Sequence, residues 1–298
     1  MRPGWSRGEE LWVSGGTCRS GRTGSGDESR VYALPDARLR PGVGAYRGFR
    51  LAGEGPRERL VVPSGKVSLL IGFGDEIRVG QAGRRPGGTA VHTSVVCGLH
   101  GRARVLGHAG RLHGVEVTLA PWAAQRMFGA PLGELADTVT DPADVLGGRV
   151  ADLREALAAA PGWPERFALL DRSLLQWSAD ADASRAPATS ARGAWDLLVR
   201  SSGTLPIREV AARTGWSIRH LETLFRREFG LTPKRVARIL RLRRATWLLT
   251  TGTRATEAAL ACGFYDQSHL NREFTALTGV TPGRFLASRA DTSVWLAG

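Results

Sequence analysis

Two related stretches organise this sequence: "GWSIRHLETLFRREFGLTP" at residues 215–233 and "GFYDQSHLNREFTALTGVTP" at residues 263–282. They share five residues at a constant separation of 49 positions. In the first copy these are Leu221, Phe225, Gly230, Thr232 and Pro233. The glycines that open the two copies are 48 positions apart, so the second copy contains one additional residue. A pair of copies indicates a duplicated structural unit rather than a long repeat array.

The first copy, read with the residues before it, predicts a helix, a turn and a second helix. Pro206 suits the start of the first helix, and Gly215 suits the left-handed residue that ends it. Ser217 is a good N-cap for the second helix. Helical spacing predicts its buried face, made of Ile218, Leu221, Leu224 and Phe225. The opposite face is polar and carries Arg219, His220, Glu222 and Thr223.

The second copy follows the same plan. Its first helix is rich in small residues, and we expect close packing at Ala258, Ala259 and Cys262, with Gly263 ending the helix. The next helix should bury Leu270 and Phe274. It presents Gln267, Ser268, His269, Asn271 and Arg272, side chains with a high capacity for hydrogen bonds. We also expect Trp216, Trp247 and Phe264 to lie in the core.

A third helix is predicted between the copies. The segment "PKRVARILRLRRATWLLT" has no internal glycine or proline and should be helical from Pro233 to about Leu249. At the rise of an α-helix, that segment is roughly 25 Å long. The two polar helix faces could then lie about 34 Å apart, which is one turn of DNA.

The distribution of charge points in the same direction. The chain of 298 residues carries a net charge of +13. Residues 191–298 hold 17 Lys or Arg against 8 Asp or Glu, so most of the excess lies in the last third of the chain. A basic domain of this kind favours a polyanionic partner such as a phosphate backbone.

Residues 191–288 resemble the DNA-binding domain of the AraC/XylS family of transcription regulators, in which two helix-turn-helix units are joined by a long helix. The resemblance rests on "SIRHLETLF", on "GLTP", on the arginine-rich "RILRLRRA" and above all on "GFYDQSHLNREFTALTGVTPGRF". It implies a sequence-specific DNA-binding regulator of transcription. The same resemblance implies base-facing positions at Arg219, Glu222, Thr223, Gln267, Ser268, His269 and Arg272. Many family members carry arginine in place of Thr223. We expect contacts to the DNA backbone from Ser217, Lys234, Arg235, Arg238, Arg244 and Asn271.

The first half of the chain predicts a different architecture. "RLVVP" (59–63) and "KVSLLIGF" (66–73) have the length of strands, and "GVEVTLAP" (114–121) alternates, with Val115, Val117 and Leu119 on one face. Helical patterns follow Pro121. The fold class is therefore α+β: a β-rich domain with trailing helices, then an all-α domain. The resemblance to AraC-type regulators implies that the β-rich domain is a degenerate cupin-like one. Residues 60–135 resemble the N-terminal sensor or dimerisation domains of actinobacterial AraC-type regulators.

We predict the following division of the chain: residues 1–30 disordered, 31–177 a sensor or dimerisation domain, 178–190 a linker, 191–288 the DNA-binding domain, and 289–298 a tail. The polar run "SADADASRAPATSARG" marks the linker. No run of 18 apolar residues occurs, and we expect a cytoplasmic, nucleoid-associated protein that does not use a membrane.

Sequence signals for a metal, cofactor or catalytic site are weak. His92, His100, His108 and His113 include no H-x-H pair, and we expect them in loops without a metal. "PSGKV" (63–67) lacks the glycine-rich lead of a phosphate loop and should be a turn. We expect no cofactor and no enzymatic activity. The alternative is a DNA-targeted enzyme, such as a repair methyltransferase fused to an AraC-type domain, for which Cys97 would be the candidate nucleophile.

Several partners are expected besides double-stranded DNA. They are RNA polymerase if the protein activates transcription, a small-molecule effector, and a second copy of the chain through the N-terminal domain. The residues that would bind an effector are not identified by the sequence.

Overall fold

The computed structural model describes residues 19–21, 29–53, 55–82, 90–183 and 191–290. The strands are β1 (Arg19–Gly21), β2 (Ser29–Ala33), β3 (Val43–Leu51), β4 (Arg57–Val61), β5 (Val67–Gly72), β6 (Ile77–Gln81), β7 (Ala90–His92), β8 (Val95–Cys97), β9 (Arg104–His108), β10 (Leu112–Leu119) and β11 (Val139–Thr140). The helices are η1 (Ala37–Leu39), α2 (Pro121–Phe128), α3 (Pro142–Leu146), α4 (Arg149–Ala159), α5 (Trp163–Ala183), α6 (Arg192–Arg200), α7 (Ile207–Thr214), α8 (Ile218–Phe229), α9 (Pro233–Thr250), α10 (Ala255–Ala261), α11 (Gln267–Thr278) and α12 (Pro282–Ala290). The α+β class is confirmed: a β-rich region precedes a helical region.

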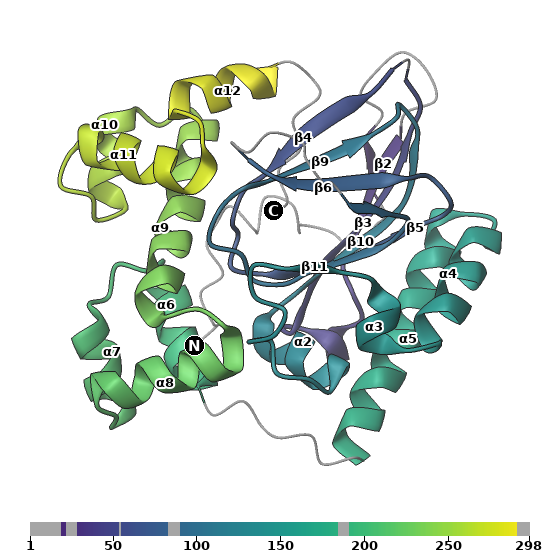
Figure 1. The fold of residues 1–298 in the computed structure, drawn as a ribbon, viewed down its shortest axis with the longest axis horizontal. Helices are drawn as coiled ribbons and strands as arrows, with labels where there is room; N and C mark the ends of the chain where they lie inside the picture. The colour runs from purple at the N-terminus through teal and green to yellow at the C-terminus, as the bar shows by residue number, and fades with distance from the viewer. Residues whose placement is uncertain (1–18, 22–28, 54, 83–89, 184–190, 291–298) are drawn as a thin grey trace.

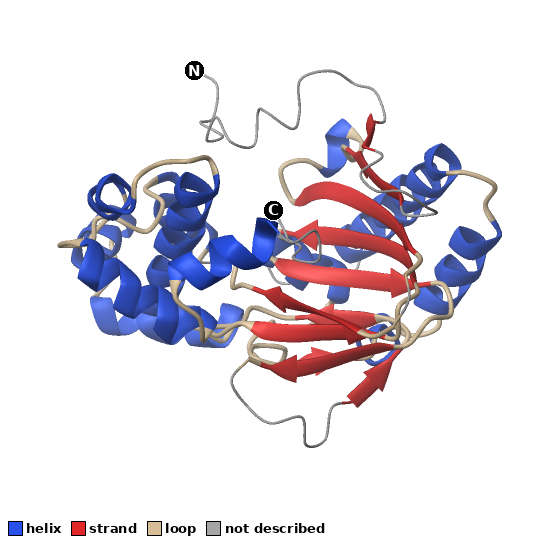
Figure 2. Cartoon of the chain, turned by 90° about the horizontal axis from the view of Figure 1, so that it is seen from above, coloured by secondary structure: helices blue, strands red, loops and turns tan. Residues whose placement is uncertain are grey.

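The β-rich region consists of two antiparallel sheets that lie face to face (Figures 1 and 2). The larger has the order β1-β2-β3-β10-β5-β8-β11, and the smaller has the order β4-β9-β6-β7. Helices α2, α4 and α5 cover the outer face of the larger sheet. Between the two sheets lies an apolar cluster formed by Phe49, Leu51, Leu70, Ile77, Val95, Leu106 and Leu112.

Strand β10 at the centre of the larger sheet shows how the layers are specified. Val115, Val117 and Leu119 are fully buried against helix residues, which confirms the predicted alternation. Glu116 points the other way and is also buried, because the second sheet covers that face. There it accepts hydrogen bonds from Arg47 and, at 2.6 Å, from the hydroxyl of Ser68. One strand therefore serves an apolar layer and a charged layer at once.

Helix α5 is attached to the sheet by a close approach and by a buried hydrogen bond. Gly48 in β3 lies beneath the ring of Trp163, where a Cβ atom would clash with the indole. The hydroxyl of Tyr46, also in β3, donates to Asp171 Oδ1 at 2.8 Å. The same oxygen accepts from the backbone N–H of Asp36, so one carboxylate joins three segments.

The helical region is built around α9 (Figure 1). Val236, Ile239 and Leu240 in its first half pack with α6, α7 and α8 in the same core as the β-rich region. Leu242, Ala245 and Leu249 in its second half pack with α10, α11 and α12. The long helix is therefore shared by both copies of the repeated unit. It begins at Pro233, as predicted, and ends at Thr250.

Both repeated units contact the β-rich region through the carboxyl ends of their second helices. At the end of α8, a Cβ atom on Gly133 would lie 2.8 Å from the carbonyl oxygen of Arg227. At the end of α11, the backbone N–H of Ala103 donates to the carbonyl oxygen of Leu277 at 2.7 Å. This bond satisfies a carbonyl that a helix end otherwise leaves unpaired. The amino ends of α8 and α11 point away from this contact.

Some predictions for the first half of the chain were wrong in detail. Three of the four histidines lie on strands rather than in loops: His92 ends β7, His108 ends β9 and His113 lies in β10. The glycine-rich stretches around these histidines contain short strands and do not form loops throughout. Within the described residues, no group of three or more His, Cys, Asp or Glu is placed to hold a metal ion. The predicted turn at "PSGKV" is present, with Gly65 at φ +74°.

Two elements lie inside segments that the sequence assigned to a linker and to a disordered stretch. Helix α5 continues to Ala183, into the predicted linker, because the alanines of "SADADA" favour helix and Gln176 donates to Asp180 one turn away at 2.8 Å. Strand β1 lies inside the segment predicted to be disordered. Ser29 and Arg30, which end that segment, begin β2. Residues 1–18, 22–28, 184–190 and 291–298 lie outside the described residues. Among the helices that the structure describes, none combines the length and apolar content needed to cross a membrane.

Candidate nucleic-acid interface

Helix α8 is positioned by the predicted cap and turns. Gly215 adopts φ +73° and ends α7, and the hydroxyl of Ser217 accepts the backbone N–H of His220 at 3.2 Å. Leu221, Leu224 and Phe225 are buried as predicted. Ile218 is not: half of its side chain is exposed, since it occupies the first turn, before the helix enters the core. Ile218 corresponds in the repeat to Gln267 of the second unit.

The polar face of α8 is accessible, but some of its groups already have partners within the helix. Arg219 and Thr223 are exposed, and Glu222 is half-buried. The Thr223 hydroxyl donates to the carbonyl oxygen of Arg219 at 3.0 Å. Arg226 lies 3.3 Å from the Glu222 carboxylate. Arg219 is therefore the base-facing candidate on this helix that has no side-chain bond among the described residues.

Helix α11 presents a similar face. Asp266 caps its amino end by accepting the backbone N–H of His269 at 2.6 Å, a role that we had not assigned from the sequence although Asp is a preferred N-cap. Gln267, Ser268 and Arg272 are exposed. The ring of His269 is held in place: its Nδ1 accepts from the N–H of Tyr265 at 3.3 Å. Its edge also packs against Phe264.

Two arginines predicted to contact phosphate have other partners in the structure. Arg238 donates to both carboxylate oxygens of Glu273 on α11, at 2.7 and 3.2 Å. Arg235 donates to Asp137 of the β-rich region at 3.1 Å. Lys234 is exposed and Arg244 is half-buried. The ion pairs could not be read from the sequence, because their carboxylates lie 35 and 98 residues away along the chain.

Exposed apolar and aromatic side chains extend this surface. Tyr265, immediately before α11, is 88% exposed, and sequence reasoning had not selected it. An exposed aromatic beside a polar helix face is the signal that could have identified it. Trp247, predicted to be buried, is 38% exposed because it lies on the outer side of α9. Cys262 and Phe264 are buried as predicted, and Trp216 packs partly buried against the main core.

Comparison with known families identifies the domain that carries this surface. Residues 194–288 match the family described as "Helix-turn-helix domain". This segment is an AraC-type helix-turn-helix domain. The AraC-type domain thus contains both repeated units, the connecting α9 and most of α12. The resemblance stated from the sequence is confirmed for this part of the chain.

Individual relatives are similar to parts of the chain. One relative is the uncharacterized HTH-type transcriptional regulator YbfI of Bacillus subtilis (strain 168). The two sequences are 38% identical over 64 residues, which make up 22% of this chain and 23% of that protein. A transcriptional regulator from Chromobacterium violaceum with an AraC-type DNA-binding domain is 31% identical over 34% of this chain and 92% of its own, with a TM-score of 0.32. ToxT from Vibrio cholerae covers 83% of this chain and 98% of its own at 11% identity and a TM-score of 0.47.

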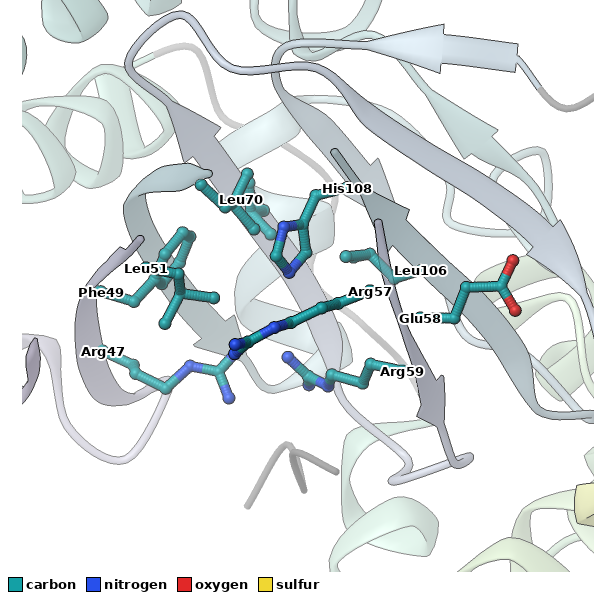
Figure 3. Close-up of a pocket in the computed structure, with 10 residues that line it drawn as sticks. Arg47, Phe49, Leu51, Arg57, Glu58, Arg59, Leu70, Leu106 and His108 are labelled. Atoms are coloured by element: carbon teal, nitrogen blue, oxygen red, sulfur yellow. The ribbon is translucent and has the colours of Figure 1, made fainter. Parts of the chain in front are cut away.

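The space between the two sheets is the natural place to look for an effector site. Figure 3 shows that Arg47, Arg57 and Arg59 point toward one another there, beside His108. Burial, reinforced by the charge of Arg47, lowers the pKa of Arg59 to about 9. Burial alone would raise the pKa of Glu116, but the neighbouring arginines and hydrogen bonds outweigh it, and this pKa lies below its usual value. The cavity measures 20 Å³, room for about one water molecule, so it does not hold a metabolite as it stands.

The cysteine that an enzyme would need as its nucleophile is not activated. Burial raises the pKa of the Cys97 thiol to about 11. Burial likewise raises the pKa of the Cys262 thiol to about 11. A reactive thiolate requires the opposite shift. These pKa values do not favour the repair-methyltransferase alternative.

Proposed function

We propose that this chain is a sequence-specific transcription regulator that reads two successive major grooves of double-stranded DNA with α8 and α11. The observation that carries the proposal is the common orientation of the two helices in one AraC-type domain. Both rest their carboxyl ends on the β-rich region and leave their polar amino-terminal halves accessible. In helix-turn-helix proteins, residues near the amino end of the reading helix contact base edges.

The chemistry of the exposed side chains suits base readout. Arg219 and Arg272 can donate two hydrogen bonds to guanine, and Gln267 can pair with adenine. Glu222 can accept from cytosine, while Ser268, His269 and Thr223 offer less specific contacts. Ile218, exposed where the repeat places Gln267, is suited to contact a thymine methyl group. We assign base readout to these residues of α8 and α11.

Contacts to phosphate would supply affinity that depends on salt. We assign this role to Lys234, Arg244, Ser217 and Asn271, and we add Tyr265, whose exposed hydroxyl can donate to a phosphate oxygen. Arg235 and Arg238 are assigned instead to the ion pairs described above. An ion pair of this kind orients the reading helices rather than the DNA.

The β-rich region is proposed to control the AraC-type domain through self-association, through a small-molecule effector, or through both. Its loops contact the ends of α8 and α11 and the start of α9, so a change in these contacts would change how the reading helices are held. An effector would act by binding one arrangement more tightly than another. The proposed setting is the cytoplasm, on the nucleoid, with RNA polymerase as a partner if the protein activates transcription.

The experiment begins with selection of genomic fragments by the full-length chain, followed by affinity measurements on one selected duplex. Arg272→Ala should weaken binding by about 1–3 kcal/mol and relax the preference at one base pair. Lys234→Ala should weaken binding to all duplexes alike and reduce the salt dependence by about one unit of slope. The control is Arg154→Ala, an exposed arginine on α4. Wild-type affinity and preference in both Arg219→Ala and Arg272→Ala would refute groove reading by these helices.

A further inference from the structure

A second pocket lies where the β-rich region meets the AraC-type domain. It measures 320 Å³ and is lined by Gln81, Arg102, Arg104, Asp137 and Arg235. The first four come from the end of β6, the loop into β9, the first residue of β9, and the loop before β11. Arg235 comes from the first turn of α9. The volume is within the range of small-molecule sites, unlike that of the cavity between the sheets.

The lining of this pocket is cationic. It contains three guanidinium groups and a single carboxylate. That carboxylate, Asp137, already uses both of its oxygens: Oδ1 accepts the backbone N–H of Gly101 at 2.8 Å, and Oδ2 accepts from Arg235 at 3.1 Å. Asp137 can therefore balance the charge of Arg235 but not the charges of Arg102 and Arg104.

Arg104 is the most unusual member of the set. Its side chain faces the pocket, yet the residue is only 8% exposed. Its buried Nε has no hydrogen-bond partner among the described residues. An uncompensated buried charge is destabilising, so proteins usually pair it. The backbone of Arg104 pairs with Val61 of β4 and Gln81 of β6, so the sheet holds the side chain at this position.

We propose that this pocket binds a small organic anion through a carboxylate or phosphate group held by Arg102 and Arg104, with Arg235 completing the site. Planar guanidinium groups match both oxyanions and bind them through paired hydrogen bonds. The anion supplies the partner that Arg104 lacks in the protein. Gln81 adds an amide that can donate to the same ligand.

The site joins the two parts of the chain. Gly101 leaves room for the guanidinium of Arg235, since a Cβ atom there would clash with it. A ligand that bridges Arg104 and Arg235 therefore ties the smaller sheet to the first turn of α9. Binding of the anion does not depend on the proposed function, but an effect of the anion on DNA affinity rests on it.

The test is calorimetric titration of the full-length chain with inorganic phosphate and, separately, with succinate, against potassium chloride of equal ionic strength. Saturable binding of at least one anion is expected, and the stronger of the two identifies the phosphate or the carboxylate class. Arg104→Met and Arg102→Gln should each weaken that binding by about tenfold or more, the loss of one charge-assisted contact. The control Arg154→Gln should bind as the wild type does.

Both pocket variants are expected to fold, so a loss of anion binding would report on the pocket and not on unfolding. Arg102 is exposed, so Arg102→Gln removes a pocket charge without disturbing the core. Arg104→Met keeps an unbranched stem, and replacing an unpaired buried charge by an apolar group is often neutral or stabilising. Failure of both anions to saturate, or equal binding by the wild type and the folded Arg102→Gln variant, would overturn the site. Anion binding without any change in DNA affinity would leave the site intact and remove only the coupling.

Discussion

Arg238 on α9 donates from Nε and Nη2 to the two carboxylate oxygens of Glu273 on α11, at 2.7 and 3.2 Å. The two side chains are 31% and 23% exposed, so this bidentate pair is partly shielded from water. It fixes the direction of the second reading helix relative to the helix that both repeated units share.

Glu273→Gln should therefore lower the free energy of unfolding by roughly 1–2 kcal/mol, less than for a fully buried pair because solvent screens part of the interaction. Urea denaturation measures the change. Glu155→Gln on the exposed side of α4 is the control, with an expected change within about 0.5 kcal/mol. A similar small change in both variants would show that the Arg238–Glu273 pair does not stabilise the domain.

Two glycines with the same backbone conformation should respond differently to alanine. Gly215 and Gly230 adopt φ +73° and +71°. No described atom lies within 4 Å of a Cβ on Gly215, whereas one on Gly230 would clash with Ala136 of the β-rich region. Gly215→Ala should cost about 1–2 kcal/mol from the left-handed backbone alone. Gly230→Ala should cost clearly more.

A double-mutant cycle isolates the steric part of that difference. Ala136→Gly should recover part of the loss in Gly230→Ala and none of the loss in Gly215→Ala. Urea denaturation of the wild type, the three single variants and the two double variants gives the coupling free energies. Equal effects of Ala136→Gly in both backgrounds would mean that the contact between α8 and the β-rich region does not form.

His100 should make the protein sensitive to acid. Burial lowers its pKa to about 4, and the charge of Arg104 lowers this pKa further. The hydrogen bonds with the backbone of Gly98 and Val62 and the charge of Asp137 raise the pKa by less. The folded state keeps this histidine neutral, while the unfolded chain takes up a proton below about pH 6.5. Stability is therefore lost as the pH falls from about 6.5 to about 4, by roughly 3 kcal/mol in all.

His100→Gln should flatten that pH dependence, which thermal or urea denaturation across pH 4–7 can record. His220→Gln, which alters an exposed ring on α8, is the control and should keep the wild-type profile. An unchanged slope in His100→Gln would show that the acid sensitivity arises elsewhere.

Glu116 should be among the residues least tolerant of change. Its carboxylate accepts from Arg47 and from Ser68 in a fully buried setting between the sheets. Glu116→Gln removes the negative charge from a buried ion pair and should cost about 3–5 kcal/mol. Ser68→Ala removes one hydrogen bond to the same carboxylate and should cost about 1–3 kcal/mol. Chemical denaturation compares the two, and the reverse order would contradict the assigned charge pairing.

The local features of the AraC-type domain could be predicted because each depends on neighbours in the sequence. Ser217, Gly215 and Gly263 cap or end helices through bonds to residues one turn away, and the 49-residue period exposes the duplication. The errors at Ile218 and Trp247 have a common cause. Helical periodicity gives the face of a residue but not whether the neighbouring element extends far enough to cover it.

The contacts between the two regions could not be predicted. Asp137 holds Arg235 only because the loop before β11 brings a residue 98 positions away beside the first turn of α9. In the sequence Arg235 is one of many arginines on a basic helix. This context favoured the prediction that Arg235 contacts phosphate. His92 and His108 were misplaced for a related reason, since strands of three to five residues leave too few positions to establish a period.

The opposite surroundings of Val115 and Glu116 on β10 also disfavour a shift in the register of this strand. If β10 shifted by one position against β3 or β5, the Glu116 carboxylate would enter the apolar layer beneath α5. A valine would then lie among the arginines between the two sheets. A slip by one residue is therefore opposed on both faces of the strand, so burial of charge helps to fix the alignment of β10.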